Sequence, residues 1–351
     1  MKIFTRNGCL RLSLLFIGLG AITSLGCCAS IKMPGHSFPS SVFTPSDSEK
    51  ALALELRRDV EKLATEIGPR NLEHYDKLNE AANWLAQEFR NAGCSVSEQS
   101  YNAEPGVFMG VWNNAKYREQ NYRNIIGELK GSSRPDEIIV IGAHYDSVAL
   151  DGCRGANDNA SGVACVLALA RHFAKSPASC TLRFVAFANE EPPFFWTAGM
   201  GSCVYAKECR TRKEKIIAML CPETIGCYSE IKGSQHYPPP LNMVYPDKGN
   251  FIAFVGNTGS ASLVRRCVGI FRETTQFPSE GAALPGMIPG IGWSDHWSFW
   301  KEGYQALMIT DTAPFRYPFY HTNHDDPDKI DYTKMARVVE GIGKIVKQLA
   351  N

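Results

Sequence analysis

Histidine and carboxylate side chains follow three apolar, strand-like runs of this 351-residue chain, at the point where each run ends. The runs are EIIVIGA (137–143), TLRFVAFA (181–188) and KIIAMLC (215–221). The side chains that follow them are His144, Asp146, Glu190, Glu191 and Glu223. In an open α/β sheet the C-terminal ends of parallel strands meet at one edge, where ligands bind. We therefore expect these side chains to lie together.

A further acid, Asp158, lies in the turn GANDNASG (155–162) between the first of these strands and the following helix. Taken alone, an Asp before a helix is more often an N-cap, and a Glu pair after a strand more often lies in a solvated loop. One His and several carboxylates at a single sheet edge instead favour a divalent cation held by nitrogen and oxygen. Zinc is the expected metal, and cobalt or manganese can use the same donors.

The elements that must position these side chains alternate between strands and helices. Helices are expected at 48–67, 74–92, 161–174, 199–214, 260–276 and 333–350, and further strands at 250–256 and 305–310. Ser46 or Asp47 can cap the first helix, and Gly93 ends the second. This alternation predicts an α/β fold, a three-layer α/β/α arrangement around a central mixed, largely parallel sheet. Residues 228–249, rich in Pro and Tyr, are expected to form a long loop.

Composition and charge exclude a nucleic-acid role. The chain has 37 Lys and Arg against 36 Asp and Glu, a formal net charge of +1, so it carries no overall field for polyanions. Because we find no internal repeat and no second linker, we expect one domain at 46–351, preceded by a Pro/Ser-rich linker at 28–45.

The N-terminus is typical of a secretory signal peptide. Three basic residues precede the apolar run at 12–26, which is shorter than the roughly 20 residues of a spanning helix. We predict a signal peptide at 1–27 and export, to the periplasm or outside the cell; an uncleaved anchor is the alternative. The tetrapeptide SLGC (24–27) resembles a bacterial lipobox, although Ser24 stands where Leu is preferred, so a lipidated Cys27 could attach the protein to a membrane.

Nine cysteines follow the predicted linker, and some of them could pair in an oxidising compartment. They are Cys94, Cys153, Cys165, Cys180, Cys203, Cys209, Cys221, Cys227 and Cys267. Because nine is odd, at least one stays free within a chain. Cys165 and Cys221 lie in apolar runs and are interpreted as buried small hydrophobes. The sequence has no CxxC pair, so a cysteine zinc site is not expected.

The ordered motifs resemble those of the M28 family of zinc metallopeptidases, the co-catalytic aminopeptidases. They are HYDS (144–147), GANDNASG (155–162), NEE (189–191), GS (201–202), SDH (294–296), HT (321–322) and DPD (326–328). The resemblance runs from about residue 66 (EIGPR) to the C-terminus. It implies the phosphorylase/hydrolase-like fold of zinc aminopeptidases and two zinc ions per chain.

The resemblance also implies a role for each residue. The implied metal ligands are His144 and Glu223 for one zinc, Glu191 and His321 for the other, and Asp158 as the bridge between them. HT at 321–322 fits the motif better than His324 does. A water shared by the two ions would lose a proton near neutral pH, and Glu190 would take that proton and return it to the leaving amine. Asp146 is expected to accept the other ring N–H of His144 and to fix its tautomer.

The substrate implied by the resemblance is a peptide with a free N-terminus, because a carboxylate-rich site can also pair with an α-ammonium group. Phe195, Trp196 and Trp297 are candidates for an apolar wall of the substrate site. Asp295 and His296 are expected to support the site without binding metal. They do not form a serine triad with Ser294, because adjacent residues cannot supply that geometry.

Two departures from the family pattern keep alternatives open. Glu223 stands where many members have Asp, and the segment PPFFWTAGM (192–200) is longer than usual and contains a Trp, as in the related glutaminyl cyclases that use one zinc. A mono-zinc acyltransferase of that kind is therefore one alternative, although NASG after Asp158 is the peptidase form. A non-catalytic binding domain on the same fold is the other, although all five ligand positions carry competent side chains.

Overall fold

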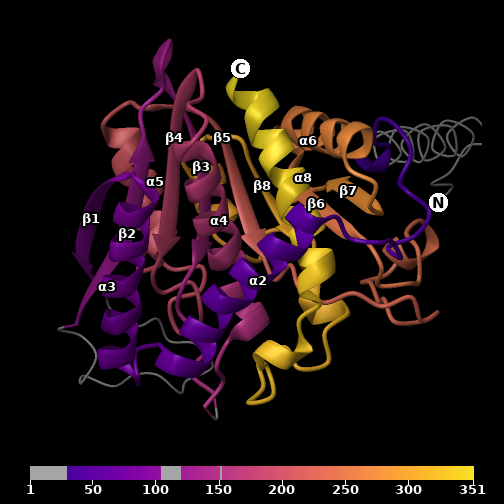
Figure 1. Cartoon of the computed structure of the whole chain (residues 1–351), viewed down its shortest axis with the longest axis horizontal. Helices are drawn as coiled ribbons and strands as arrows, with labels where there is room; N and C mark the ends of the chain where they lie inside the picture. Colours follow the sequence, from indigo (N-terminus) through magenta and orange to yellow (C-terminus); the bar gives the residue numbers. More distant parts are fainter. Residues whose placement is uncertain (1–29, 104–119, 151) are drawn as a thin grey trace, which may run out of the picture.

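The computed structural model describes residues 30–103, 120–150 and 152–351. These residues fold around one sheet of eight strands in the spatial order β1-β2-β4-β3-β5-β8-β6-β7 (Figure 1). The strands are β1 (Ser95–Asn102), β2 (Asn121–Leu129), β3 (Arg134–His144), β4 (Cys180–Phe187), β5 (Lys215–Glu223), β6 (Ile252–Gly256), β7 (Ser279–Ala283) and β8 (Ala306–Thr310). The neighbours β4, β3, β5 and β8 are parallel, whereas β2 and β6 run against them. The prediction of a mixed, largely parallel sheet is confirmed.

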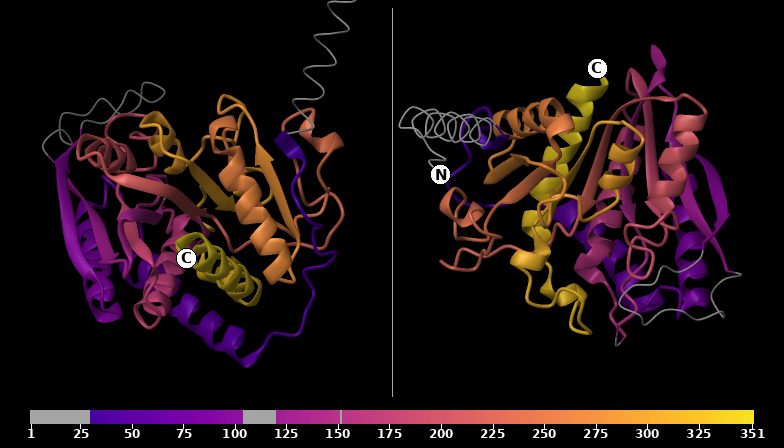
Figure 2. Two further views of the ribbon diagram at one scale, coloured as in Figure 1. Left: turned by 90° about the horizontal axis from the view of Figure 1, so that it is seen from above. Right: turned by 180° about the vertical axis from the view of Figure 1, so that it is seen from behind.

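Helices cover both faces of the sheet (Figure 2). They are α2 (Asp47–Glu61), α3 (Tyr75–Ala92), α4 (Gly162–Ala174), α5 (Gly201–Thr211), α6 (Ala261–Thr274), α7 (His296–Lys301) and α8 (Tyr332–Ala350). Helices α2, α3, α4, α6 and α8 lie on one face, and α5 and α7 on the other. The predicted three-layer arrangement is therefore confirmed.

Side-chain alternation along the central strands explains why both faces are buried. In β3, Ile139 and Ile141 belong to the hydrophobic cluster that includes α4, whereas Ile138 and Val140 belong to the cluster that includes α5. Complete burial of a side chain of this size contributes about 1.5–3 kcal/mol. The same alternation places His144, at the end of β3, on the face that α5 covers.

The predicted helices and strands are found close to their expected bounds, but β1, β2, β7 and α7 were not predicted. Strand β1 is largely polar and exposed, and β7 consists of five mostly small residues, so neither carries a clear apolar pattern. The first helix is α-helical to Glu61 and continues as a π-helix over Lys62–Ile67. Ser46 caps it in a capping box, and Gly93 ends α3 with a φ of 95°, as expected.

The segment before the first helix is packed against the domain. Ser37 Oγ accepts a hydrogen bond of 2.9 Å from the backbone N–H of Ser279 in β7. Ser41 donates from its backbone and its hydroxyl to Glu230, at 3.0 and 2.7 Å. Residues 28–45 have the composition of a linker. Their described part nevertheless packs against β7, an edge strand of the sheet.

The nine cysteines among the described residues are all unpaired, so the disulfides that an oxidising compartment would permit are not found among them. Cys165 and Cys221 are fully buried in apolar surroundings, as expected. The predicted signal peptide and Cys27 lie outside the described residues, so export and lipidation stay predictions. No helix in the described part of the chain is long and apolar enough to cross a bilayer.

Candidate metal centre

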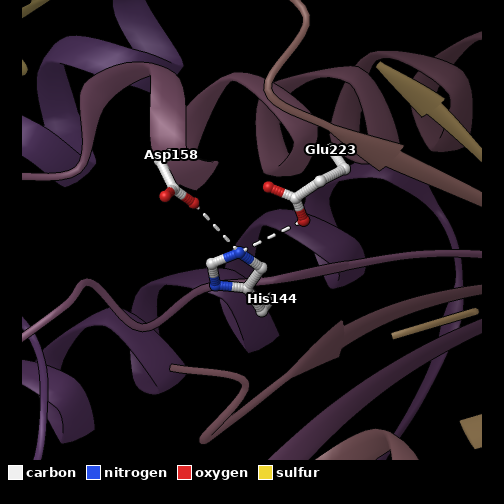
Figure 3. A group of neighbouring side chains, drawn as sticks. All are labelled: His144, Asp158 and Glu223. Atoms are coloured by element: carbon white, nitrogen blue, oxygen red, sulfur yellow. Dashed lines mark ion pairs between the residues drawn. The ribbon is translucent and has the colours of Figure 1, made fainter. Parts of the chain in front are cut away.

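Three adjacent strands deliver the candidate side chains to one edge of the sheet. Strand β3 ends at His144, β5 ends at Glu223, and the chain leaves β4 at Phe187 just before Glu190 and Glu191. Asp158 comes from the kinked turn Ala156–Ser161, where its own backbone is not helical, and His321 comes from the segment between β8 and α8. Figure 3 shows the ring of His144 between the carboxylates of Asp158 and Glu223.

The donor atoms form two groups that share Asp158. His144 Nε2 lies 3.2 Å from Asp158 Oδ1 and 3.3 Å from Glu223 Oε2 (Figure 3). His321 Nε2 lies 3.1 Å from Asp158 Oδ2 and 3.2 Å from Glu191 Oε2. In a tetrahedral site with bonds of about 2.0–2.1 Å, neighbouring ligand atoms lie about 3.3–3.4 Å apart. The spacing in both groups therefore suits a cation.

The hydrogen bonding of the donor group formed by Asp158, Glu191 and His321 also fits a cation. Among the side chains that the structure describes, Glu191 Oε1 is buried without a hydrogen-bond partner, and the contacts of the buried His321 Nε2 with Asp158 and Glu191 lack hydrogen-bond geometry. Buried polar atoms are normally satisfied, because an unpaired one costs about 1–3 kcal/mol. A divalent ion is the partner that a histidine nitrogen and carboxylate oxygens share most readily, so these residues fit zinc.

Burial raises the pKa of three glutamates at the centre. It raises the pKa of Glu190 well above its usual value, and the neighbouring Glu191 and Glu223 act in the same direction. The pKa of Glu191 is also raised, and that of Glu223 is raised to about 7. So many carboxylates can all be charged only if cations lie among them; without cations, some of them take up protons. Metal binding at this edge would therefore release protons.

The pKa values of the two histidines and of Asp158 shift toward the charged forms of these side chains, because each faces groups of opposite charge. Although burial opposes it, Glu191 and Asp158 raise the pKa of His321 to about 11. Glu223, Asp146 and Asp158 likewise raise the pKa of His144. The two rings hold the pKa of Asp158 well below its usual value, against the effect of burial. Asp158 is therefore the acid that stays charged between the two rings.

Glu190 is close to the donor groups but belongs to neither. Its Oε2 lies 3.9 Å from His144 Nε2, and the residue is 6% exposed. It lines the cavity at this edge together with Asp158, Glu191 and His321. Its carboxylate is thus placed to accept a proton from a molecule in that cavity.

Asp146 has a wider role than the sequence predicted. His144 Nδ1 lies 3.2 Å from the backbone carbonyl of Asp146 and 3.4 Å from its Oδ1, in line with the expected contact to the imidazole. The two carboxylate oxygens of Asp146 also accept the backbone N–H groups of Glu190 and Glu191, each at 3.1 Å. Asp146 therefore ties the end of β3 to the segment that follows β4.

Sequence reasoning missed three residues that hold the ligands. Ser294 and Asn159 donate to Glu223 Oε2 at 2.7 and 3.0 Å. Asp325 accepts the backbone N–H groups of residues 157 and 158, at 2.8 and 3.0 Å. All three residues lie in or next to a sequence motif: Ser294 in SDH, Asn159 in GANDNASG, and Asp325 just before DPD. Nothing in those motifs showed which partner each residue bonds.

The backbone turns sharply next to several ligands. Asn189, Thr224 and His321 have φ values of 60°, 49° and 56°, which are uncommon for residues other than glycine. The N–H of Thr224 donates to Asn159 Oδ1 at 3.1 Å, which helps to hold this conformation. Such conformations persist where the surroundings impose them, and they cluster at functional sites.

Arg70 holds two loops next to the metal centre in place. It is fully buried and donates to backbone carbonyls, with Nε 2.6 Å from Tyr145 O and Nη2 2.9 Å from Gly155 O. Its own carbonyl accepts the N–H of Ser147 at 2.9 Å. Burial lowers the pKa of Arg70 to about 10, which still leaves it charged at neutral pH. Arg70 thus fixes the loop that follows His144 and the loop that leads to Asp158.

Arg70→Lys is expected to lower the free energy of unfolding by about 2–4 kcal/mol, because an ammonium group cannot reach all these carbonyls. Urea denaturation of the metal-free protein measures the change. Arg57→Lys is the matched control: Arg57 is exposed and pairs with Glu61, so little change in the midpoint is expected. Equal midpoints for the two variants would contradict the role of Arg70.

Two of the three aromatic residues predicted to form an apolar wall line the cavity at the metal centre. Phe195 and Trp196 line the cavity beside the metal donors, and Trp196 is 47% exposed. Trp297 is absent from the lining residues of this cavity; it packs against Trp196 with ring centroids 6.1 Å apart. Trp297 lies one residue after the start of α7, and its role in the substrate site stays a prediction.

Asp295 and His296 are fully buried and belong to neither donor group. His296 Nε2 lies 2.7 Å from the carbonyl of Ile291, and burial lowers the pKa of His296 to about 4. The imidazole is therefore neutral at neutral pH and holds the loop before α7. Burial raises the pKa of Asp295 to about 7.

Comparison with known proteins bears on this centre. The sequence profile of "Peptidase family M28" matches residues 124–346, which include every candidate metal ligand described above. "Uncharacterized protein YfbL" of Escherichia coli (strain K12) is 36% identical to the chain over 305 residues, covering 85% of this chain and 88% of YfbL.

Solved structures resemble the fold. BSAP, a zinc aminopeptidase from Bacillus subtilis, superimposes with a TM-score of 0.65 at 16% identity, over 85% of this chain and 95% of BSAP. A glutaminyl cyclase from Bacteroides thetaiotaomicron, bound to N-acetylhistamine, gives 0.62 at 18% identity, over 87% of this chain and 99% of the cyclase. At such identities the likeness concerns the fold alone.

Proposed function

The chain belongs to peptidase family M28, and on that premise we propose that it is a zinc-dependent aminopeptidase, which hydrolyses the first peptide bond of substrates with a free N-terminus. The observation that carries the proposal is the pair of donor groups that share Asp158, with Glu190 beside them and in neither. A binding domain without catalysis would have no need of that extra buried carboxylate.

His144, Glu223 and Asp158 would hold one zinc ion, and Glu191, His321 and Asp158 the other. When bound, zinc supplies positive charge that polarises the scissile carbonyl and makes water a better nucleophile at neutral pH. Asp146 keeps His144 oriented toward the centre and fixes the backbone of Glu190 and Glu191.

Glu190 performs the proton transfers in this proposal. Its carboxylate accepts the proton of the attacking water and then passes it to the nitrogen of the leaving amine. Phe195 and Trp196 line the cavity in which the substrate would bind.

The number of zinc ions separates this proposal from its nearest alternative. We expect about two zinc ions per chain by elemental analysis after dialysis against metal-free buffer, because both donor groups are complete. Chelation should abolish the release of amino acids from aminoacyl-anilides, and added zinc should restore it.

The alternative is a glutaminyl-cyclase-like acyltransferase. It is favoured by the exposed Trp196 at the cavity and by the similarity of the fold to that of the Bacteroides cyclase. One zinc ion per chain, with cyclisation of an N-terminal Gln peptide and no peptidase activity, would establish that alternative. A chain that binds no metal would instead be a binding domain.

A further inference from the structure

A second cavity adjoins the metal centre and shares Glu223, Trp293 and Tyr320 with the first. Its floor is formed by β8, β6 and β7, on the face opposite to α6 and α8. Loops that include residues 235–245 and 289–293 form its roof. The empty space, which includes the solvent at its open mouth, is about 810 Å³.

Most of the lining is apolar, and its charged members are two carboxylates. Phe251, Val255 and Met308 are among the side chains of the floor. Glu223 lies at the metal end, and Glu280, from β7, is the other charged side chain among the lining residues. Once cations fill the metal centre, Glu280 is the negative charge that the cavity still offers.

Strand register places Glu280 in line with the metal centre. Glu223 pairs with Thr310, Thr310 pairs with Ala253, and Ala253 pairs with Glu280. These four residues form one row across β5, β8, β6 and β7. Three strand spacings separate Glu223 from Glu280, which is about 14 Å between their backbones. The cavity therefore runs along this row from the metal ligands to a carboxylate.

The carboxylate of Glu280 has only a weak ion-pair partner among the described residues. Its one ion pair among the described residues is with Arg272, at 3.7 Å, and its side chain is 24% exposed. The nitrogens of Arg272 donate to the carbonyls of Ser279, Pro34 and Gly35 and to Ser279 Oγ. Burial raises the pKa of Glu280, so a cation in the cavity would stabilise its charged form.

We propose that this cavity binds the first side chain of the substrate and that Glu280 selects long side chains ending in a cation, those of Arg and Lys. The inference rests on the proposed aminopeptidase function and names its substrate class. The aliphatic stem would lie on Val255 and Met308, and the cationic head would donate to Glu280. A long stem is needed because the carboxylate lies three strands from the metal centre.

Charge and stem length can be separated with matched substrates. For the zinc-loaded enzyme, we expect kcat/KM to be about 10- to 100-fold higher for arginyl- and lysyl-anilides than for the uncharged citrullyl- and norleucyl-anilides. Glu280→Gln should remove this preference and change the norleucyl rate less than about twofold. Glu273→Gln, an exposed glutamate on α6, is the control and should behave as the wild type.

The proposal is overturned if the wild type cleaves norleucyl- and citrullyl-anilides as well as their charged counterparts, or if Glu280→Gln slows all four substrates equally. Either result leaves the peptidase function intact. Calorimetry with argininamide and norleucinamide gives a readout without turnover. If no anilide is cleaved, tighter binding of argininamide that Glu280→Gln abolishes supports the cavity assignment and refutes the catalysis, whereas equal binding of the two amides overturns both.

Discussion

Glu190→Gln is expected to lower kcat of the zinc-loaded protein by about 10²- to 10⁴-fold on an aminoacyl-anilide, because the variant loses both the base and the acid of the reaction. The amide keeps the shape of the side chain but cannot accept the proton. KM should change little, since Glu190 is not one of the proposed metal ligands. Steady-state kinetics at saturating zinc measure the effect.

Glu191→Gln is the matched control, because it makes the same chemical change at the neighbouring position. Glu191 Oε2 lies 3.2 Å from His321 Nε2 within a donor group, whereas Glu190 is in neither group. We expect Glu190→Gln to keep its zinc and Glu191→Gln to lose part of it. Full activity in Glu190→Gln, or equal zinc loss in both variants, would contradict the assignment of Glu190.

The sequence was sufficient to predict the strand ends that carry the ligands, and the reason is physical. Buried parallel strands are almost continuously apolar, so the first polar residues after β3, β4 and β5 stand out in the sequence. His321 lacked this signal, because it lies in an irregular segment between β8 and α8, and it was assigned through the family motif.

The residues that hold the ligands were not predicted, because they act through contacts between distant segments. Arg70 bonds to the carbonyls of residues 145 and 155, and Asp325 bonds to the backbone of residues 157 and 158. Such pairings depend on how loops pack, which local periodicity does not encode. Glu280 was missed for the same reason, because only strand register aligns it with Glu223.

Asp158→Asn is expected to remove zinc from both donor groups and to lower kcat/KM by at least about 10³-fold. Asp158 offers Oδ1 to the group of His144 and Oδ2 to the group of His321, and an amide has one oxygen and no charge. The local fold should persist, because Asp325 holds the backbone N–H of residue 158 at 3.0 Å and asparagine keeps the shape of the side chain.

Glu223→Gln tests whether Asp158 is a bridge, because Glu223 belongs to one donor group only. We expect this variant to keep about one zinc ion per chain and Asp158→Asn to keep fewer. Zinc at 100 times its Kd would stabilise the wild type by about 2.7 kcal/mol for each site that it fills and so raise the melting temperature, and Asp158→Asn should lose this stabilisation. If Asp158→Asn keeps one zinc ion per chain and Glu223→Gln keeps two, Asp158 binds only one metal ion and does not bridge the two donor groups.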